Sequence, residues 1–119
     1  MGAIDHHAEA GRILDAHARL ATLDPISDRF ELALDDAYAI QALITEARLS
    51  RGERVVGWKL GYTSLAMREQ MGVDAPNFGP LTDAMLLGDG TAVPATMTQP
   101  RVEPEVALRF ARDVDTGAD

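Results

Sequence analysis

The chain has 119 residues, of which 46% are hydrophobic and 25% charged, a composition typical of one small globular domain rather than a disordered or membrane protein. Its net charge of -8 argues against nucleic acid or an anionic membrane as a partner, because both carry phosphate groups that would be repelled. The sequence contains no cysteine, which excludes disulfides, thiolate metal ligands and a cysteine nucleophile, and it fits a cytoplasmic location.

Two segments near the N-terminus have the apolar periodicity of a helix. The first is predicted over residues 5–22, with Asp5 as its N-cap. The second is predicted over residues 35–50, with Asp35 as its N-cap. Together they make up an N-terminal helical segment, residues 1–52.

The pattern then changes from helical to extended. Residues 54–61 are rich in β-branched and aromatic side chains and carry glycines, which predicts a strand. A short helix is predicted over residues 64–71, capped by Thr63 or Ser64. Residues 72–80 contain several turn-forming residues and are expected to form a loop.

Short strands dominate the prediction for the remainder of the chain. They are expected at residues 81–87, at 91–93 after a turn at 88–90, and at 101–110. Helices followed by strands predict an α+β fold rather than alternating α/β. Residues 53–119 would then be the first part of an incomplete β domain.

The strongest chemical signal lies in the last predicted strand. With a period of two, Glu103 and Glu105 share one face of this strand, while Val106 and Leu108 share the other. Two carboxylates about 7 Å apart at Cα can converge on one hard divalent cation such as Mg²⁺ or Mn²⁺. A solvated strand face with ordinary glutamates explains the same spacing, although Pro104 indicates an edge strand or a bulge.

The second signal is Lys59, in the middle of the strand predicted over 54–61. It stands between Gly57 and Gly61, where the absence of side chains allows a ligand to approach the backbone. A partly buried lysine can bind a carboxylate or transfer a proton. A surface lysine on the exposed face of the strand is the alternative interpretation.

Other polar residues give weaker signals. The loop around Asn77 has polar groups that could line a pocket, although an ordinary turn explains them equally. The three histidines, His6, His7 and His17, are interpreted as surface residues of the first helix.

Three stretches resemble, in order and separation, the 2-keto-4-pentenoate hydratase and 4-oxalocrotonate decarboxylase family of the fumarylacetoacetate hydrolase superfamily. They read GWKLGYTS from Gly57, MGVDAPNFGPLTDAM from Met71 and QPRVEPEVAL from Gln99. The upstream DDAYAIQ helix is also similar to that of the family. The resemblance extends from about Leu34 to Asp115, and it implies the N-terminal half of a protein about twice this length.

The family resemblance implies N-terminal helices followed by part of a mixed β-sandwich roll. It also implies a divalent metal, commonly Mg²⁺ or Mn²⁺, held by three carboxylates. Glu103 and Glu105 match two of these, and the third belongs to a later glutamate of the family. Lys59 matches the family's catalytic strand lysine. The candidate substrate-binding residues are Thr63, Ser64, Asn77 and Arg101.

The resemblance implies the addition of water to 2-hydroxypenta-2,4-dienoate, giving 4-hydroxy-2-oxopentanoate in meta-cleavage degradation of aromatic compounds. Many hydratases have Asp where this chain has Asn77, and Asn cannot act as a carboxylate base, so only hydrogen bonding carries over. The alternatives are 4-oxalocrotonate decarboxylase, another C–C hydrolase of the superfamily, or an inactive fragment or assembly partner. A small 2-oxo acid substrate, a homo-oligomer and association with enzymes of the same pathway are expected.

Overall fold

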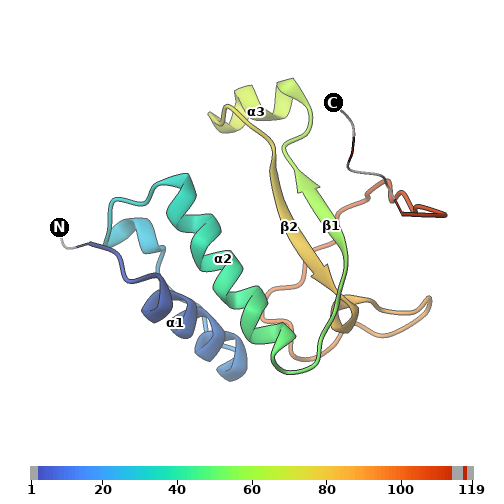
Figure 1. Ribbon diagram of the computed structural model, residues 1–119, viewed down its shortest axis with the longest axis horizontal. Helices are drawn as coiled ribbons and strands as arrows, with labels where there is room; N and C mark the ends of the chain where they lie inside the picture. Colours follow the sequence, from blue (N-terminus) through green and yellow to red (C-terminus); the bar gives the residue numbers. More distant parts are fainter. Residues whose placement is uncertain (1–2, 114–116, 118–119) are drawn as a thin grey trace.

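The computed structural model of the chain describes residues 3–113 and 117. Helices come first along the chain and are followed by one antiparallel pair of strands (Figure 1), which confirms the α+β prediction. Within the predicted segment 53–119, residues 114–116 and 118–119 lie outside the described residues, as does the end of the family resemblance at Asp115.

Helix α1 spans His6–Arg19. Its N-cap is Asp5, as predicted, and the Asp5 side chain accepts a hydrogen bond from the Ala8 N–H at 3.0 Å. The helix ends earlier than predicted because Leu20 adopts the left-handed conformation, with φ of 56°.

Helix α2 spans Leu34–Leu49 and begins one residue before the prediction. The predicted cap, Asp35, lies inside the first turn and is therefore wrong. Asp36 instead accepts a hydrogen bond from the Ala33 N–H at 3.0 Å. His6 Nε2 lies 2.8 Å from Asp36 Oδ1, and this hydrogen bond lowers the pKa of Asp36 and joins the starts of the two helices.

The two helices lie side by side and enclose a small core (Figure 1). Its buried apolar side chains are Ala10, Ala16 and Ile40. Glu9 is buried beside them, with 4% of its surface exposed, and it accepts hydrogen bonds from Arg12 and Arg29. Because Arg29 follows the short 3₁₀ helix Ile26–Asp28, the contact with Glu9 holds this connection against α1.

Strand β1 spans Val55–Gly61, close to its prediction, and pairs antiparallel with strand β2, Asn77–Thr82. Lys59 is the partner of Gly79 in this register. Helix α3, Leu65–Met71, connects the two strands and agrees with the predicted short helix. A two-stranded sheet is the only sheet among the described residues, so the β-sandwich roll is not observed there.

The boundaries predicted around β2 are wrong. The loop predicted over 72–80 contains the first four residues of the strand, and the strand predicted over 81–87 ends at Thr82. A 3₁₀ turn, Asp83–Met85, follows it. Pro80, which lacks an N–H, fits in β2 because, among the described residues, this strand pairs with β1 alone.

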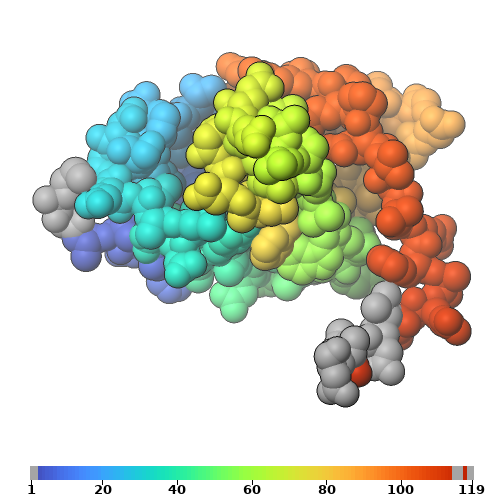
Figure 2. All heavy atoms as spheres, turned by 90° about the horizontal axis from the view of Figure 1, so that it is seen from above, coloured from blue at the N-terminus to red at the C-terminus, as the bar shows by residue number. Residues whose placement is uncertain are grey.

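The later predicted strands are also wrong. The turn at 88–90 is present, with the Thr91 N–H donating to the Gly88 carbonyl at 3.1 Å, but residues 91–93 and 101–110 have no regular structure. In the part of the chain that the structure describes, these residues have no strand to pair with. Figure 2 shows this C-terminal segment, residues 91–113, in orange and red along one side of the molecule.

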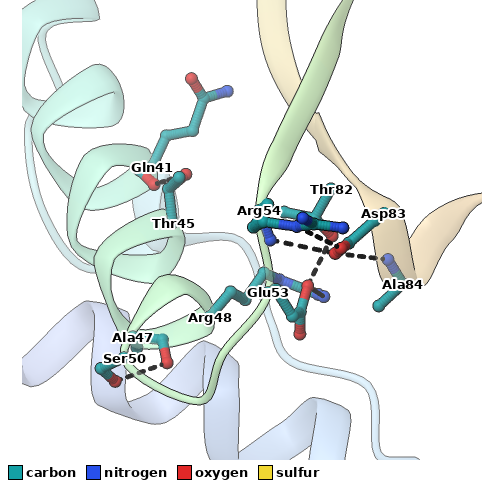
Figure 3. Close-up of polar contacts among 10 residues, drawn as sticks. All are labelled: Gln41, Thr45, Ala47, Arg48, Ser50, Glu53, Arg54, Thr82, Asp83 and Ala84. Carbon is teal, nitrogen blue, oxygen red and sulfur yellow. Dashed lines mark hydrogen bonds and ion pairs between the residues drawn. The ribbon is translucent and has the colours of Figure 1, made fainter.

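A polar network joins the end of α2 to the strand pair (Figure 3). The Thr82 hydroxyl, only 1% exposed, donates to Glu53 Oε2, and Arg48 lies 3.7 Å from the same carboxylate oxygen. Asp83 accepts from the Arg54 N–H at 3.0 Å and from Arg54 Nε at 3.2 Å. The Arg54 backbone N–H is the main cause that lowers the pKa of Asp83.

Aromatic side chains complete the contact between α2 and the strands. The Phe78 ring stacks on Tyr38 at 4.9 Å between centroids and meets Trp58 edge-on at 5.7 Å. The Phe78 N–H donates to the Tyr38 hydroxyl, and Gln41 donates to the Phe78 carbonyl, both at 3.3 Å. These contacts fix α2 beside the part of the sheet that carries Lys59. No helix of the described residues has the length and apolar character to span a membrane.

Candidate metal and substrate site

A pocket of about 880 Å³ lies between α2, the strand pair and the extended C-terminal segment. Four separate stretches of the sequence contribute to it. Six of the seven predicted site residues line this pocket: Lys59, Thr63, Ser64, Asn77, Glu103 and Glu105. Their function remains a prediction, but the structure brings them to one place.

Lys59 and the two glutamates form the charged centre of the pocket. Lys59 Nζ lies 2.6 Å from Glu105 Oε1 and 3.3 Å from Glu103 Oε2. These contacts, with the hydrogen bond to Glu105 first, raise the pKa of Lys59. Lys59 therefore points from β1 toward both glutamates.

The backbone structure that brings the two glutamates together differs from the prediction. Glu103 and Glu105 were expected on one face of a regular strand over 101–110, and that strand is absent. Their carboxylates nevertheless converge, because both contact the same ammonium group. Val106 and Leu108, expected on the opposite strand face, are 91% and 82% exposed.

The turn after β1 places two further side chains at the pocket. Tyr62 has a φ of 55°, a left-handed conformation that reverses the chain after the strand. Arg68 Nη1 donates to the carbonyls of Tyr62 and Thr63, both at 2.9 Å, and so holds the turn. Ser64 is the N-cap of α3, and its hydroxyl accepts from the Met67 N–H at 3.2 Å. Thr63 therefore has the freer hydroxyl of the two.

Asn77 stands at the start of β2 opposite Gly61. A Cβ atom at Gly61 would collide with Asn77 Oδ1, so any larger residue there would force the Asn77 side chain to move. Arg101, the seventh predicted residue, does not line the pocket. Among the described residues it makes neither a hydrogen bond nor an ion pair, so the structure does not bring it to the other six.

Three residues at or beside the pocket were missed as site residues. Tyr38 and Gln41 of α2 line it, and the DDAYAIQ stretch that contains Tyr38 was a usable signal. Arg68 supports the turn through backbone carbonyls. Because any sequence can supply carbonyl acceptors, no sequence pattern marks Arg68.

Comparison with known proteins gives several relatives. The chain is 47% identical over 94 residues to 2-keto-4-pentenoate hydratase of Paraburkholderia xenovorans, covering 77% of this chain and 35% of that protein. It is 46% identical over 109 residues to 2-keto-4-pentenoate hydratase 1 of Dechloromonas aromatica, covering 90% and 41%. It is 40% identical over 105 residues to 2-hydroxypent-2,4-dienoate hydratase of Pseudomonas putida, covering 86% and 47%.

The chain is a homologue of the 2-keto-4-pentenoate hydratases. It spans between about a third and a half of the length of these hydratases. The hydratases are lyases. Their sequence identity to this chain confirms the family resemblance found in the sequence. No family model matches the chain.

A solved structure extends the comparison beyond the hydratases. The 4-oxalocrotonate decarboxylase of Pseudomonas putida G7, complexed with magnesium and adipate, matches with a TM-score of 0.62 and 35% sequence identity. The match covers 66% of this chain and 30% of the decarboxylase. The same decarboxylase has also been solved with calcium and acetate. The decarboxylase therefore holds a divalent cation.

The donor set of this chain fits a hard divalent cation. Glu103 and Glu105 already converge on one positive charge, and Mg²⁺ is commonly bound by one or two carboxylates together with water and substrate oxygens. Within the described ranges, no three His, Asp or Glu side chains gather as a complete metal site. A cation held by this pair would therefore have only part of its coordination shell from these side chains.

Proposed function

We propose that this chain carries the Lys59, Glu103 and Glu105 centre of a hydratase that adds water to 2-hydroxypenta-2,4-dienoate, giving 4-hydroxy-2-oxopentanoate. The observation that carries the proposal is the convergence of both glutamates on Lys59 in a pocket lined by six predicted site residues. The hydratase relatives support the choice of reaction. We also propose that the β1–β2 pair is part of a larger mixed β roll, as in the family.

In this proposal Glu103 and Glu105 hold a divalent cation, Mg²⁺ or Mn²⁺. When bound, such a cation supplies Lewis-acid stabilisation of negative charge on the substrate's 2-oxo oxygen. The Lys59 ammonium, next to this position, binds the substrate carboxylate or transfers a proton. The Thr63 hydroxyl and the Asn77 amide orient the substrate by hydrogen bonds, because both line the same pocket.

Part of the pocket wall is apolar, which suits the hydrocarbon part of a dienoate. Leu34 and Met67 line it beside the rings of Tyr38 and Phe78. Polar groups line the same pocket, among them Lys59, Thr63 and Asn77. A small acid with a short unsaturated tail matches this combination of polar and apolar surface.

Decarboxylation of 4-oxalocrotonate is the second candidate reaction, and the likeness to the decarboxylase structure favours it. The same carboxylate pair and lysine would serve there, with the charge left after loss of CO₂ stabilised at the same place. An inactive fragment or assembly partner is the third, because the glutamate pair alone is an incomplete metal site.

The wider context of the protein also remains a proposal. We place the reaction in meta-cleavage degradation of aromatic compounds, in the cytoplasm, with a homo-oligomeric enzyme that associates with others of that pathway. The hydratase relatives imply a small-molecule substrate.

The test is an assay of the chain, alone and extended to the length of its relatives, on 2-hydroxypentadienoate and on 4-oxalocrotonate with Mg²⁺ or Mn²⁺. The extended protein is expected to consume the dienoate faster, and Glu105→Gln is expected to abolish the reaction. Faster release of CO₂ from 4-oxalocrotonate would favour the decarboxylase. Metal-independent turnover unaffected by Glu105→Gln would refute the proposed site.

A further inference from the structure

Lys59 is the only lysine in the sequence. Its ammonium lies between the two carboxylates, at 2.6 Å from Glu105 and 3.3 Å from Glu103, and no other basic side chain among the described residues contacts them. Since a cation shared by both carboxylates would also lie between them, the ammonium and the divalent cation compete for one position.

The lysine can leave this position without disturbing the core. Its side chain is 46% exposed, and Glu103 and Glu105 are 67% and 54% exposed, so all three can be solvated separately. The strand backbone at Lys59 is fixed by pairing with Gly79, so movement is confined to the four-carbon side chain. The glutamates lie on a segment without regular structure, which leaves their spacing adjustable.

We propose that Lys59 holds the place of the divalent cation between Glu103 and Glu105, and that it must move out when the cation binds. This inference rests on the proposed function, because it requires the glutamate pair to be the metal site. Once displaced, the ammonium remains within the pocket that Thr63 and Asn77 line. When the metal binds, Lys59 therefore loses its contacts with Glu103 and Glu105 and donates hydrogen bonds to the substrate carboxylate instead.

The effect of the Lys59 charge on cation affinity is large enough to measure. A divalent cation and an ammonium about 4 Å apart in water repel each other by the equivalent of roughly 30-fold in affinity. Salt reduces this repulsion between exposed groups. Removing the lysine charge is therefore expected to tighten cation binding by between about tenfold and about 30-fold.

The experiment titrates the full 119-residue chain with Mn²⁺ by calorimetry, in wild type, Lys59→Met, Lys59→Gln and the double variant Glu103→Gln/Glu105→Gln. Arg51→Met is the matched control, because it removes one positive charge from an exposed residue remote from the pocket. Circular dichroism verifies that each variant is folded. In parallel, the single lysine is isotopically labelled in wild type, and its side-chain NMR signal is followed as Mg²⁺ is added.

Tighter Mn²⁺ binding in both Lys59 variants but not in Arg51→Met, with a lysine signal that moves on addition of Mg²⁺, is the expected result. If binding depends on the glutamates but the Lys59 variants bind no more tightly than wild type, the inference is overturned and the proposed metal site stands. If Mn²⁺ binding is absent, or unchanged in the double glutamate variant, the proposed metal site is overturned and the inference with it.

Discussion

Replacing Phe78 with alanine is expected to lower the free energy of unfolding by about 3 kcal/mol, because this residue joins α2 to both strands. Phe78 is 47% exposed, so about half of its surface is buried. Burial of roughly 100 Å² contributes about 2.5 kcal/mol, an upper value because denatured chains are partly compact. The ring contacts with Tyr38 and Trp58 each add about 0.5 kcal/mol or more.

Urea denaturation measures this loss. Circular dichroism follows the helices, and the fluorescence of Trp58, the only tryptophan, follows the strand pair. Phe110→Ala is the control, because Phe110 is 72% exposed and has no ring contact among the described residues, so a change within about 0.5 kcal/mol is expected. A loss below about 1 kcal/mol for Phe78→Ala, or one equal to that of Phe110→Ala, would refute the role assigned to Phe78.

Three further outcomes are expected. Thr82→Val should lower the free energy of unfolding by about 1–3 kcal/mol, measured by urea denaturation, because the carboxylate of Glu53 loses a buried donor. A loss no larger than that of Ser50→Ala, which removes an exposed hydroxyl, would contradict this. The pKa of Asp83 is lowered from 3.8 mainly by the Arg54 N–H, so its stabilising contribution is present above pH 3.8 and is lost as the pH falls through the lower folded pKa. The stability advantage of wild type over Asp83→Asn should therefore shrink on acidification, whereas a gap that stays constant down to about pH 3 would count against it. Finally, the chain alone should bind Mn²⁺ weakly in calorimetry and show little or no hydration of the dienoate, because two carboxylates leave a hard cation under-coordinated by protein; tight stoichiometric binding with turnover would show that another residue or subunit completes the site.

Local sequence signals predicted the helices and β1 well. The Asp5 cap of α1 and the Ser64 cap of α3 depend on hydrogen bonds within three residues, so the pattern contains the information. The start of α2 was less well predicted, since Asp36 at the third helical position supplies the capping carboxylate instead of Asp35. Such shifts of one residue decide the cap but not the existence of a helix.

Strands were predicted poorly because a strand depends on its partner. Gly79 and Pro80 are typical of a turn, yet they belong to β2 because β1 provides the pairing partner. Residues 101–110 have the alternating pattern of a strand, but nothing in the described part of the chain pairs with them. No local pattern contains either fact.

The candidate site was predictable as a set of residues but not as a geometry. The spacing of Glu103 and Glu105 and the position of Lys59 between glycines indicated the chemistry, and the structure places all three in contact. The supporting contacts of Arg68 could not be foreseen, because they depend on the left-handed turn at Tyr62. Arg101 shares the motif of the glutamates but lies away from the pocket, which shows that proximity in sequence is a weak guide there.

A crystal structure of the chain soaked with Mn²⁺ and a small dicarboxylate, recorded with the anomalous signal of manganese, tests the central claim most directly. One anomalous peak is expected about 2.1 Å from an oxygen of Glu103 and of Glu105, with Lys59 Nζ turned toward the dicarboxylate. A peak elsewhere in the molecule, or no peak while Lys59 still bridges both glutamates, would contradict the account.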